Sequence, residues 1–291
     1  MEHSVQLGTQ YYHESICRRL RELREHEELP VVFYEHQQGK RWLIDCQFQL
    51  PSPEQGEGQD TIKRIHSYYL ANALAETILN QWEKDYVHRL LKKKFNFKSE
   101  AEQVLGKAME YLNDTPAERK SYSGNRKTAL VNQIVLCLDH QSQFDIEGFL
   151  RFRAQDYKEQ VQKAVTHVVD EYIIEKEYIE FIQLLKHFVD SQTPRMHTLH
   201  VGITSKGKFH LYNEEGKIVT NEYMDDLAFG SPGDEYCYED MLISALIAVA
   251  PRQIVLHIRY EGYKDTLNTI LQVFEGRVSY CSDGCFICDK I

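Results

Sequence analysis

The sequence lacks any segment that would direct the chain to a membrane or across one. Met1 to Gln6 contain no basic stretch followed by an apolar one, so we recognise no secretory signal. The most apolar run, residues 241–250, has ten residues, which is about half of what a membrane-spanning helix needs. We therefore expect a cytoplasmic protein with no membrane partner. Its seven cysteines should then be reduced rather than joined in disulfides.

An excess of positive charge is also lacking. The chain has 34 Lys and Arg against 44 Asp and Glu, a net charge of -10, so nucleic acid is not the expected partner. Residues 84–127 depart from this balance with eleven basic and six acidic side chains, a local charge of +5 (11 − 6). Weak nucleic-acid binding through this basic segment is our third functional hypothesis. We favour a solvated helix face paired with acidic residues, because no nucleic-acid-binding motif accompanies the charge.

The sequence also lacks recognisable catalytic motifs. The sequence contains no Gly-x-Ser-x-Gly and no His-Glu-x-x-His, and no histidine has a glutamate three residues before it. Ser123 to Thr128 end somewhat like a phosphate-binding loop but lack its glycines. These absences favour a non-enzymatic protein.

Only seven prolines and fifteen glycines interrupt the chain, which favours long regular elements, and their positions suggest the domain limits. Residues 1–50 predict a small α/β unit, with a helix over 11–29 and strands over 31–36 and 41–48. Residues 51–60, rich in Pro, Gly and acidic residues, predict a linker. Residues 61–192 predict a helical region, with helices over 61–96, 99–111, 126–139 and one long helix over 146–190.

The last part of the chain, residues 193–291, predicts an α/β domain. Its apolar patterns indicate two helices, over 239–250 and 263–274, and four strands, over 198–204, 208–213, 254–258 and 277–281. The order helix, strand, helix, strand contains a βαβ unit, which requires a parallel strand pair. The fold class predicted for the whole chain is therefore α+β.

Three cysteines near the C-terminus form the most chemically specific feature. Cys281, Cys285 and Cys288 lie within eight residues and follow a predicted parallel strand, where open α/β sheets place ligands. Thiolates bind Zn²⁺ or iron–sulfur clusters, so the cluster predicts a metal site, with Zn or Fe–S as cofactor. The fourth ligand stays open among Cys237, His257 and His200. His257 is attractive because its strand should neighbour residues 277–281.

A family resemblance adds a cellular process. Residues 149–159 (FLRFRAQDYKE), residues 169–189 (VDEYIIEKEYIEFIQLLKHFV), residues 196–201 and residues 241–252 (MLISALIAVAPR) resemble the YtxC-like family of sporulation proteins from endospore-forming bacteria. The resemblance covers roughly residues 60–291, and it implies a cytoplasmic bacterial protein with a role in sporulation. Together with the missing catalytic motifs, it leads us to expect a non-enzymatic scaffold that binds protein partners. A metal-binding module is the alternative.

Overall fold

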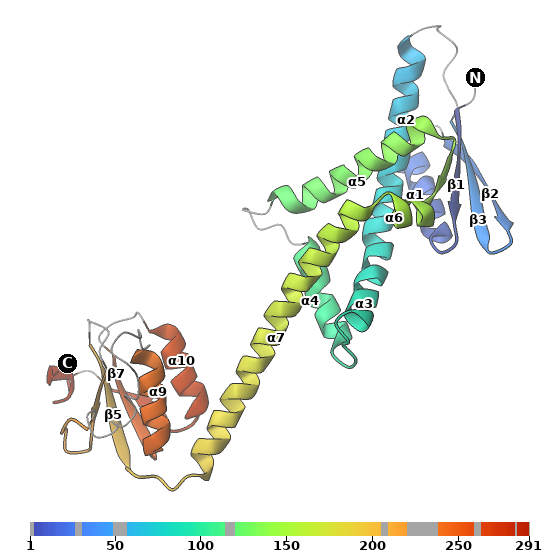
Figure 1. Ribbon diagram of the computed structural model, residues 1–291. Coiled ribbons are helices and arrows are strands. Elements are labelled where there is room, and N and C mark those ends of the chain that lie inside the picture. The colour runs from blue at the N-terminus through green and yellow to red at the C-terminus, as the bar shows by residue number, and fades with distance from the viewer. Residues whose placement is uncertain are drawn as a thin grey trace, which may run out of the picture. The chain divides into compact units, whose positions relative to one another are not determined.

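The computed structural model describes residues 3–26, 31–48, 57–113, 120–204, 209–219, 238–258, 263–282 and 284–290 (Figure 1). The chain forms two compact units, Met1–Ile173 and Ile174–Ile291, and the boundary lies inside the long helix α7 (Gln155–Ser191). Each unit combines helices with a four-stranded mixed sheet, so the predicted α+β class is confirmed. None of the described helices has both the length and the apolar character that crossing a bilayer requires.

The sheet of the first unit has the strand order β2-β3-β1-β4. Its strands are β1 (His3–Thr9), β2 (Val31–Gln38), β3 (Arg41–Phe48) and β4 (Gln143–Asp145). β2 and β3 form the predicted hairpin, whose turn holds Gly39 at φ 63°, a conformation that favours glycine. β1 pairs antiparallel with β3 and parallel with β4. The sequence did not predict β1 or β4, whose pairing partners in the sheet, β3 and β1, are distant in the chain.

The helices of the first unit pack with this sheet around one apolar core. They are α1 (His13–His26), α2 (Glu57–Thr77), the π-helix η1 (Ile78–Trp82), α3 (Glu83–Lys93), α4 (Ala101–Asn113), α5 (Lys120–His140), α6 (Ile146–Phe152) and the first part of α7. The core takes side chains from strands and helices alike, including Leu7, Ile44, Leu74 and Ile134. α2 begins at Glu57, so the last four residues of the predicted linker are helical.

Two helices that the sequence predicted as continuous are interrupted. Between α2 and α3, the π-helix closes with a bond from the Glu83 N–H to the Ile78 carbonyl. Between α6 and α7, Ala154 is fully buried and its N–H bonds the Phe149 carbonyl at 3.0 Å. The Asp145 carboxylate caps α6 by accepting from the Gly148 N–H at 2.6 Å. The apolar periodicity continues through both interruptions, so it did not mark them.

The second unit has the strand order β6-β5-β7-β8. Its elements are the end of α7, β5 (Thr198–Ile203), β6 (Phe209–Tyr212), α9 (Tyr238–Val249), β7 (Gln253–Ile258), α10 (Lys264–Val273), β8 (Val278–Tyr280) and the 3₁₀ turn η3 (Cys288–Lys290). β7, α10 and β8 form the predicted βαβ unit, and β5 also pairs parallel with β7. Because α9 and α10 lie on the same side of the sheet (Figure 1), only one sheet face is covered by these two helices.

Alternation along the strands assigns the residues of each face. Leu199 lies beside Ile254, and Val201 beside Leu256, in the core that contains α9 and α10. The residues between them point to the opposite face, because successive side chains of a strand alternate. His200 and His257 belong to that opposite face.

Candidate metal centre

The C-terminal loop brings three thiols to the sheet face that carries His257. Cys281 directly follows β8, and its N–H bonds the Leu256 carbonyl at 2.9 Å, which extends the parallel ladder beside β7. The loop then returns so that Ile287 and Cys288 are buried. His257, on β7, is only 2% exposed. The end of the chain and the middle of β7 therefore meet at one place.

Four ligand atoms converge there within 4.8 Å of one another: the Sγ atoms of Cys281, Cys285 and Cys288 and one ring nitrogen of His257. His257 Nδ1 lies 3.2 Å from the Cys288 sulfur and 3.4 Å from the Cys285 sulfur. The Cys288 sulfur lies 3.6 Å from that of Cys285 and 3.8 Å from that of Cys281.

These separations can be compared with those around a tetrahedral zinc ion. Bonds of about 2.3 Å to sulfur and about 2.0–2.1 Å to nitrogen put two sulfurs about 3.8 Å apart, and a sulfur and a nitrogen about 3.5 Å apart. The four distances given above, 3.2 and 3.4 Å between nitrogen and sulfur and 3.6 and 3.8 Å between sulfurs, fall within a few tenths of an ångström of those values. These four separations are compatible with a single tetrahedral ion.

The loop between Cys285 and Cys288 has the local geometry of a metal-binding turn. Gly284, at φ 98°, adopts a conformation that L side chains rarely take and reverses the chain just before Cys285. The Cys288 N–H then points back at the Cys285 sulfur, 3.5 Å away. Backbone donors of this kind stabilise negative charge on a sulfur.

The surroundings of Cys281 and Cys285 shift the pKa values of their thiols in opposite directions. Desolvation, reinforced by hydrogen bonds with the Cys285 and Cys288 sulfurs, raises the pKa of Cys281 to about 12. Desolvation opposes ionisation of Cys285 as well, but hydrogen bonds from the Cys288 N–H, the Cys281 thiol, the Ile287 N–H and the Cys288 thiol together outweigh it and lower the pKa of Cys285. Cys285 is thus prepared to ionise, while Cys281 needs a nearby cation to become a thiolate.

His200 lies behind His257 and not among the sulfurs. Its Nδ1 is 3.0 Å from His257 Nε2, across the parallel pair β5–β7. Burial lowers the pKa of both rings, and His200 lowers that of His257 further, which favours the neutral form of each. If His257 Nε2–H donates to His200, the lone pair of His257 Nδ1 is left facing the sulfurs. Metal-bound histidines commonly have such a partner on the other nitrogen.

The other residues that the sequence suggested for metal or nucleic-acid binding do not lie at the cysteine cluster in the described part of the chain. Cys237, the third candidate for fourth ligand, lies outside the described residues. In the basic segment, Phe95 and Phe97 are partly buried against the core of the first unit, which limits them as stacking platforms for bases. Arg126 is buried and pairs with the fully buried Glu83 at 3.3 Å. The charge of this residue is neutralised inside the unit.

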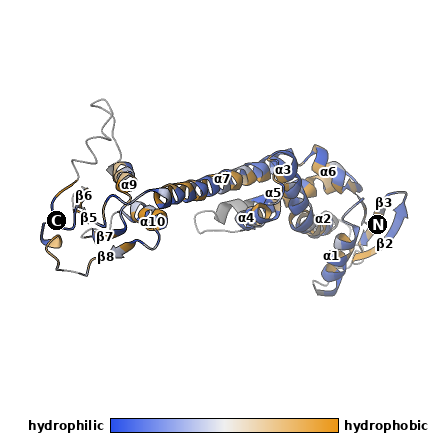
Figure 2. Cartoon of the chain, turned by 90° about the horizontal axis from the view of Figure 1, so that it is seen from below, coloured by the Kyte–Doolittle hydropathy of each residue, from blue (hydrophilic) through white to orange (hydrophobic). Residues whose placement is uncertain are grey.

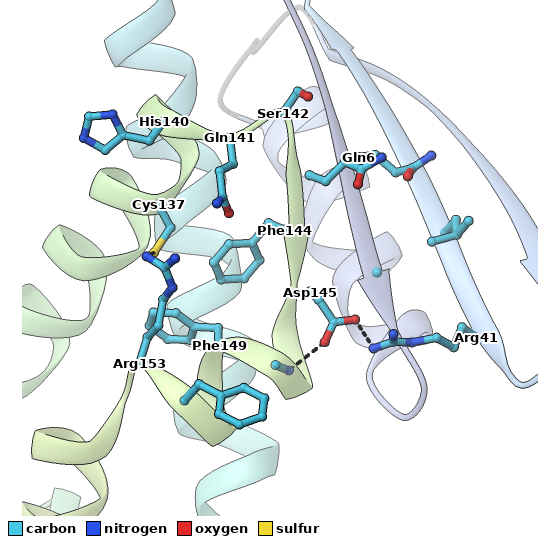
Figure 3. A pocket seen from close by; sticks show the side chains of 15 residues that line it. Gln6, Arg41, Cys137, His140, Gln141, Ser142, Phe144, Asp145, Phe149 and Arg153 are labelled. Atoms are coloured by element: carbon cyan, nitrogen blue, oxygen red, sulfur yellow. Dashed lines mark hydrogen bonds and ion pairs between the residues drawn. The ribbon is translucent and has the colours of Figure 1, made fainter.

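A cavity of about 710 Å³ lies in the first unit between the sheet and α5 and α6 (Figure 3). Asp145 contacts Arg41 there while it caps α6, and Arg153 donates to the Cys137 sulfur at 3.8 Å. The Asp145 carboxylate is therefore engaged by its own fold. The sequence contained no signal for this cavity, since its walls come from elements distant in the chain: β1, β3, α5, β4 and α6.

Comparison with known proteins gives one family. The profile of the YtxC-like family matches residues 68–279. The chain is also 28% identical over 218 residues to the uncharacterised protein YtxC of Bacillus subtilis (strain 168), an alignment that covers 72% of this chain and 75% of the relative. No solved structure matches the chain.

Proposed function

The chain belongs to the YtxC-like family, and from that premise we propose that it is a zinc-binding, non-enzymatic protein that supports sporulation through protein contacts. The observation that carries the zinc site is the convergence of Cys281, Cys285, Cys288 and His257 at tetrahedral distances. Four protein ligands complete the coordination of Zn²⁺, and closed sites of this kind are structural, whereas catalytic zinc keeps an open position.

The same geometry favours one ion over an iron–sulfur cluster. All four ligand atoms lie within 4.8 Å of one another, which suits a single central metal. A cluster needs room for several irons and their inorganic sulfides between the ligands. A site with three thiolates, one neutral imidazole and Zn²⁺ carries a net charge of about −1, and the loop N–H groups around Cys285 offset part of it.

Elemental analysis of anaerobically purified, chelator-washed protein tests the zinc site. We expect one tightly bound zinc per chain, and its loss when Cys285 and Cys288 are both changed to Ser. Cys137→Ser is the matched control, because this cysteine lies in the first unit outside the cluster, and it should keep the zinc. Less than about a tenth of an equivalent of zinc in the native protein would reject a tight site.

A specific feature of α7 supports the interaction role. Ile174, Phe181, Leu184 and Phe188 are 53–67% exposed and are spaced i, i+7, i+10 and i+14, which places them on one side of the helix. Ile182 and Val189, on another side, are buried in the core of the second unit. Apolar and polar segments alternate along α7 in Figure 2. A row of large apolar side chains in water is typical of a protein-binding surface.

We propose that this row binds an amphipathic helix of a partner protein, and that basic residues flank the apolar face of that helix. Grooves and stripes at helical spacing bind the apolar face of such helices. Glu177 lies within the row and Glu180 beside it, and both are exposed, so they would attract Lys or Arg on the partner. This contact would provide the link to sporulation that the family implies.

Affinity capture from sporulating cells tests this role. We expect a partner retained by native protein and by the control Tyr34→Glu, whose tyrosine is 60% exposed in the first unit, but lost with Phe181→Glu. Equal capture by all three proteins, or normal spore yield in a strain without the gene, would contradict the proposal. Concentration-dependent dimers abolished by Phe181→Glu would assign the row to a second copy instead.

A further inference from the structure

A second group of metal-ligating side chains lies in the first unit, far in sequence from the cysteine cluster. One ligand atom each from His13, Cys17 and Glu35 lies within 4.8 Å of the other two. The Cys17 sulfur is 3.4 Å from Glu35 Oε2, and His13 Nε2 contacts the same oxygen directly. Sequence reasoning missed this group, because Glu35 is on a different element from the other two.

The fold explains why these three side chains meet. His13 and Cys17 are four residues apart on α1, so they project from the same side of the helix. The His13 ring stacks on Trp42, with centroids 3.9 Å apart and planes 15° apart, and this contact fixes the direction of its nitrogens. Glu35 comes from β2. A helix and a strand of the same unit therefore supply the ligands, and an aromatic ring orients one of them.

The chemistry of the three groups suits zinc. Zn²⁺ is bound by thiolate, imidazole and carboxylate, and a site with one thiolate, one carboxylate and a neutral histidine has no net charge. Neutrality matters because Cys17 is only 1% exposed and the site is half-buried. The Glu35 side chain is 38% exposed, so it can move by the roughly 1 Å needed to admit an ion between itself and His13.

A polar cavity of about 450 Å³ adjoins the three ligands and also exposes Arg18 and Arg21. Three protein ligands leave one tetrahedral position open, and the cavity that all three ligands line would give water or a small anion access to it. The two arginines would attract an anionic group to it. An ion pair between His13 and Glu35 alone would not require a buried thiol aimed at the same oxygen.

We propose that His13, Cys17 and Glu35 form a second zinc site, whose open position accepts water or a small oxyanion from the cavity beside Arg18 and Arg21. This site is independent of the cysteine cluster in the other unit. It is weaker than that cluster, since it has one thiolate against three and one protein ligand fewer.

Zinc titration of metal-stripped, reduced protein against a chromophoric chelator tests this proposal. The native chain should take up two equivalents of Zn²⁺, one tight and one weaker. Glu35→Gln and His13→Ala should each lose the weaker equivalent, and the Cys285→Ser, Cys288→Ser double variant should keep it. His36→Ala is the matched control, because His36 is on the same strand but faces Asp45, 3.4 Å away, and it should take up two.

The outcomes separate the two sites. A native chain that takes up one equivalent, lost only with Cys285 and Cys288, overturns the second site and leaves the proposed function intact. A second equivalent that Glu35→Gln still binds overturns the assignment of its ligands. Circular dichroism identifies a variant that has not folded, and Glu35→Gln, a change at a half-exposed position, keeps the test valid if His13→Ala fails.

The open position has its own test. In the Cys285→Ser, Cys288→Ser variant loaded with Co²⁺, inorganic phosphate should shift the visible spectrum of the metal, because it replaces water at the fourth position. Arg21→Gln should weaken this response. A spectrum that phosphate does not change overturns the open position.

Discussion

The two units stabilise their sheets by different means. In the first unit, strands and helices share one large apolar core, and a buried pair, Glu83 and Arg126, lies inside it. In the second, α9 and α10 cover one sheet face, while a short loop with three cysteines meets His257 on the other. Among the described residues, the cysteine loop and not α9 or α10 meets the second sheet face, so the proposed metal would stabilise a face that these two helices do not cover. The experiments below test that contrast.

Removal of zinc should have the largest effect, and it should be confined to the second unit. Structural zinc in small domains contributes about 10–16 kcal/mol of apparent binding energy, comparable to the whole stability of a domain. We expect a strong chelator to abolish amide-exchange protection in β7 and β8 and to leave β3 protected. Native protection of β7 in fully metal-free protein would show that its apolar core is sufficient and break the comparison.

Loss of the buried ion pair should have the next largest effect, in the first unit. Arg126 is 4% exposed, contacts Glu83 and donates to the Leu112 carbonyl at 3.0 Å. Arg126→Met leaves the buried Glu83 carboxylate without a counter-charge, so the free energy of unfolding should fall by about 3–5 kcal/mol. Denaturant titration measures this change, and zinc content should stay the same.

The control for that pair is its sequence neighbour. Lys127 pairs with Glu76 at 2.9 Å, but both side chains are partly exposed, at 41% and 29%. Lys127→Met should therefore cost at most about 1 kcal/mol. Equal costs for the two substitutions would mean that burial of the Glu83 pair is not what stabilises the first unit.

Loss of the histidine behind the metal ligand should have the smallest effect. His200→Ala removes the 3.0 Å partner of His257 Nε2 and should weaken zinc binding about 10–100-fold while one zinc still binds. His210→Ala on the adjacent strand β6 is the control, and it should leave the affinity unchanged. A complete loss of zinc with His200→Ala would mean that His200, and not His257, binds the metal.

Much of the candidate site follows from the order of residues. The spacing of Cys281, Cys285 and Cys288 predicts metal binding from the sequence alone. The predicted βαβ unit then suggested His257 as their neighbour. The choice between His257 and His200 could not be made from sequence, because both are strand histidines on the same face. The register of β5 on β7 puts one ring among the sulfurs and the other behind it.

The group of His13, Cys17 and Glu35 shows more clearly what cannot be predicted from the sequence. Helical spacing relates His13 to Cys17, but nothing in the sequence relates either one to Glu35. Their meeting depends on how α1 lies relative to β2, which is set by packing within the shared core.

By itself, the sequence determined the α+β class, most helices and strands, the family and the cysteine cluster, because these depend on local periodicity and on residues close together in the chain. The tertiary structure alone decided the addition of β1 and β4 to the first sheet, the π-helical turn before Glu83, the break at Ala154, and the partners of the cysteines. Those features depend on contacts between residues distant in the chain. Such contacts form only when apolar faces pack and buried polar groups find partners, and no local pattern records them.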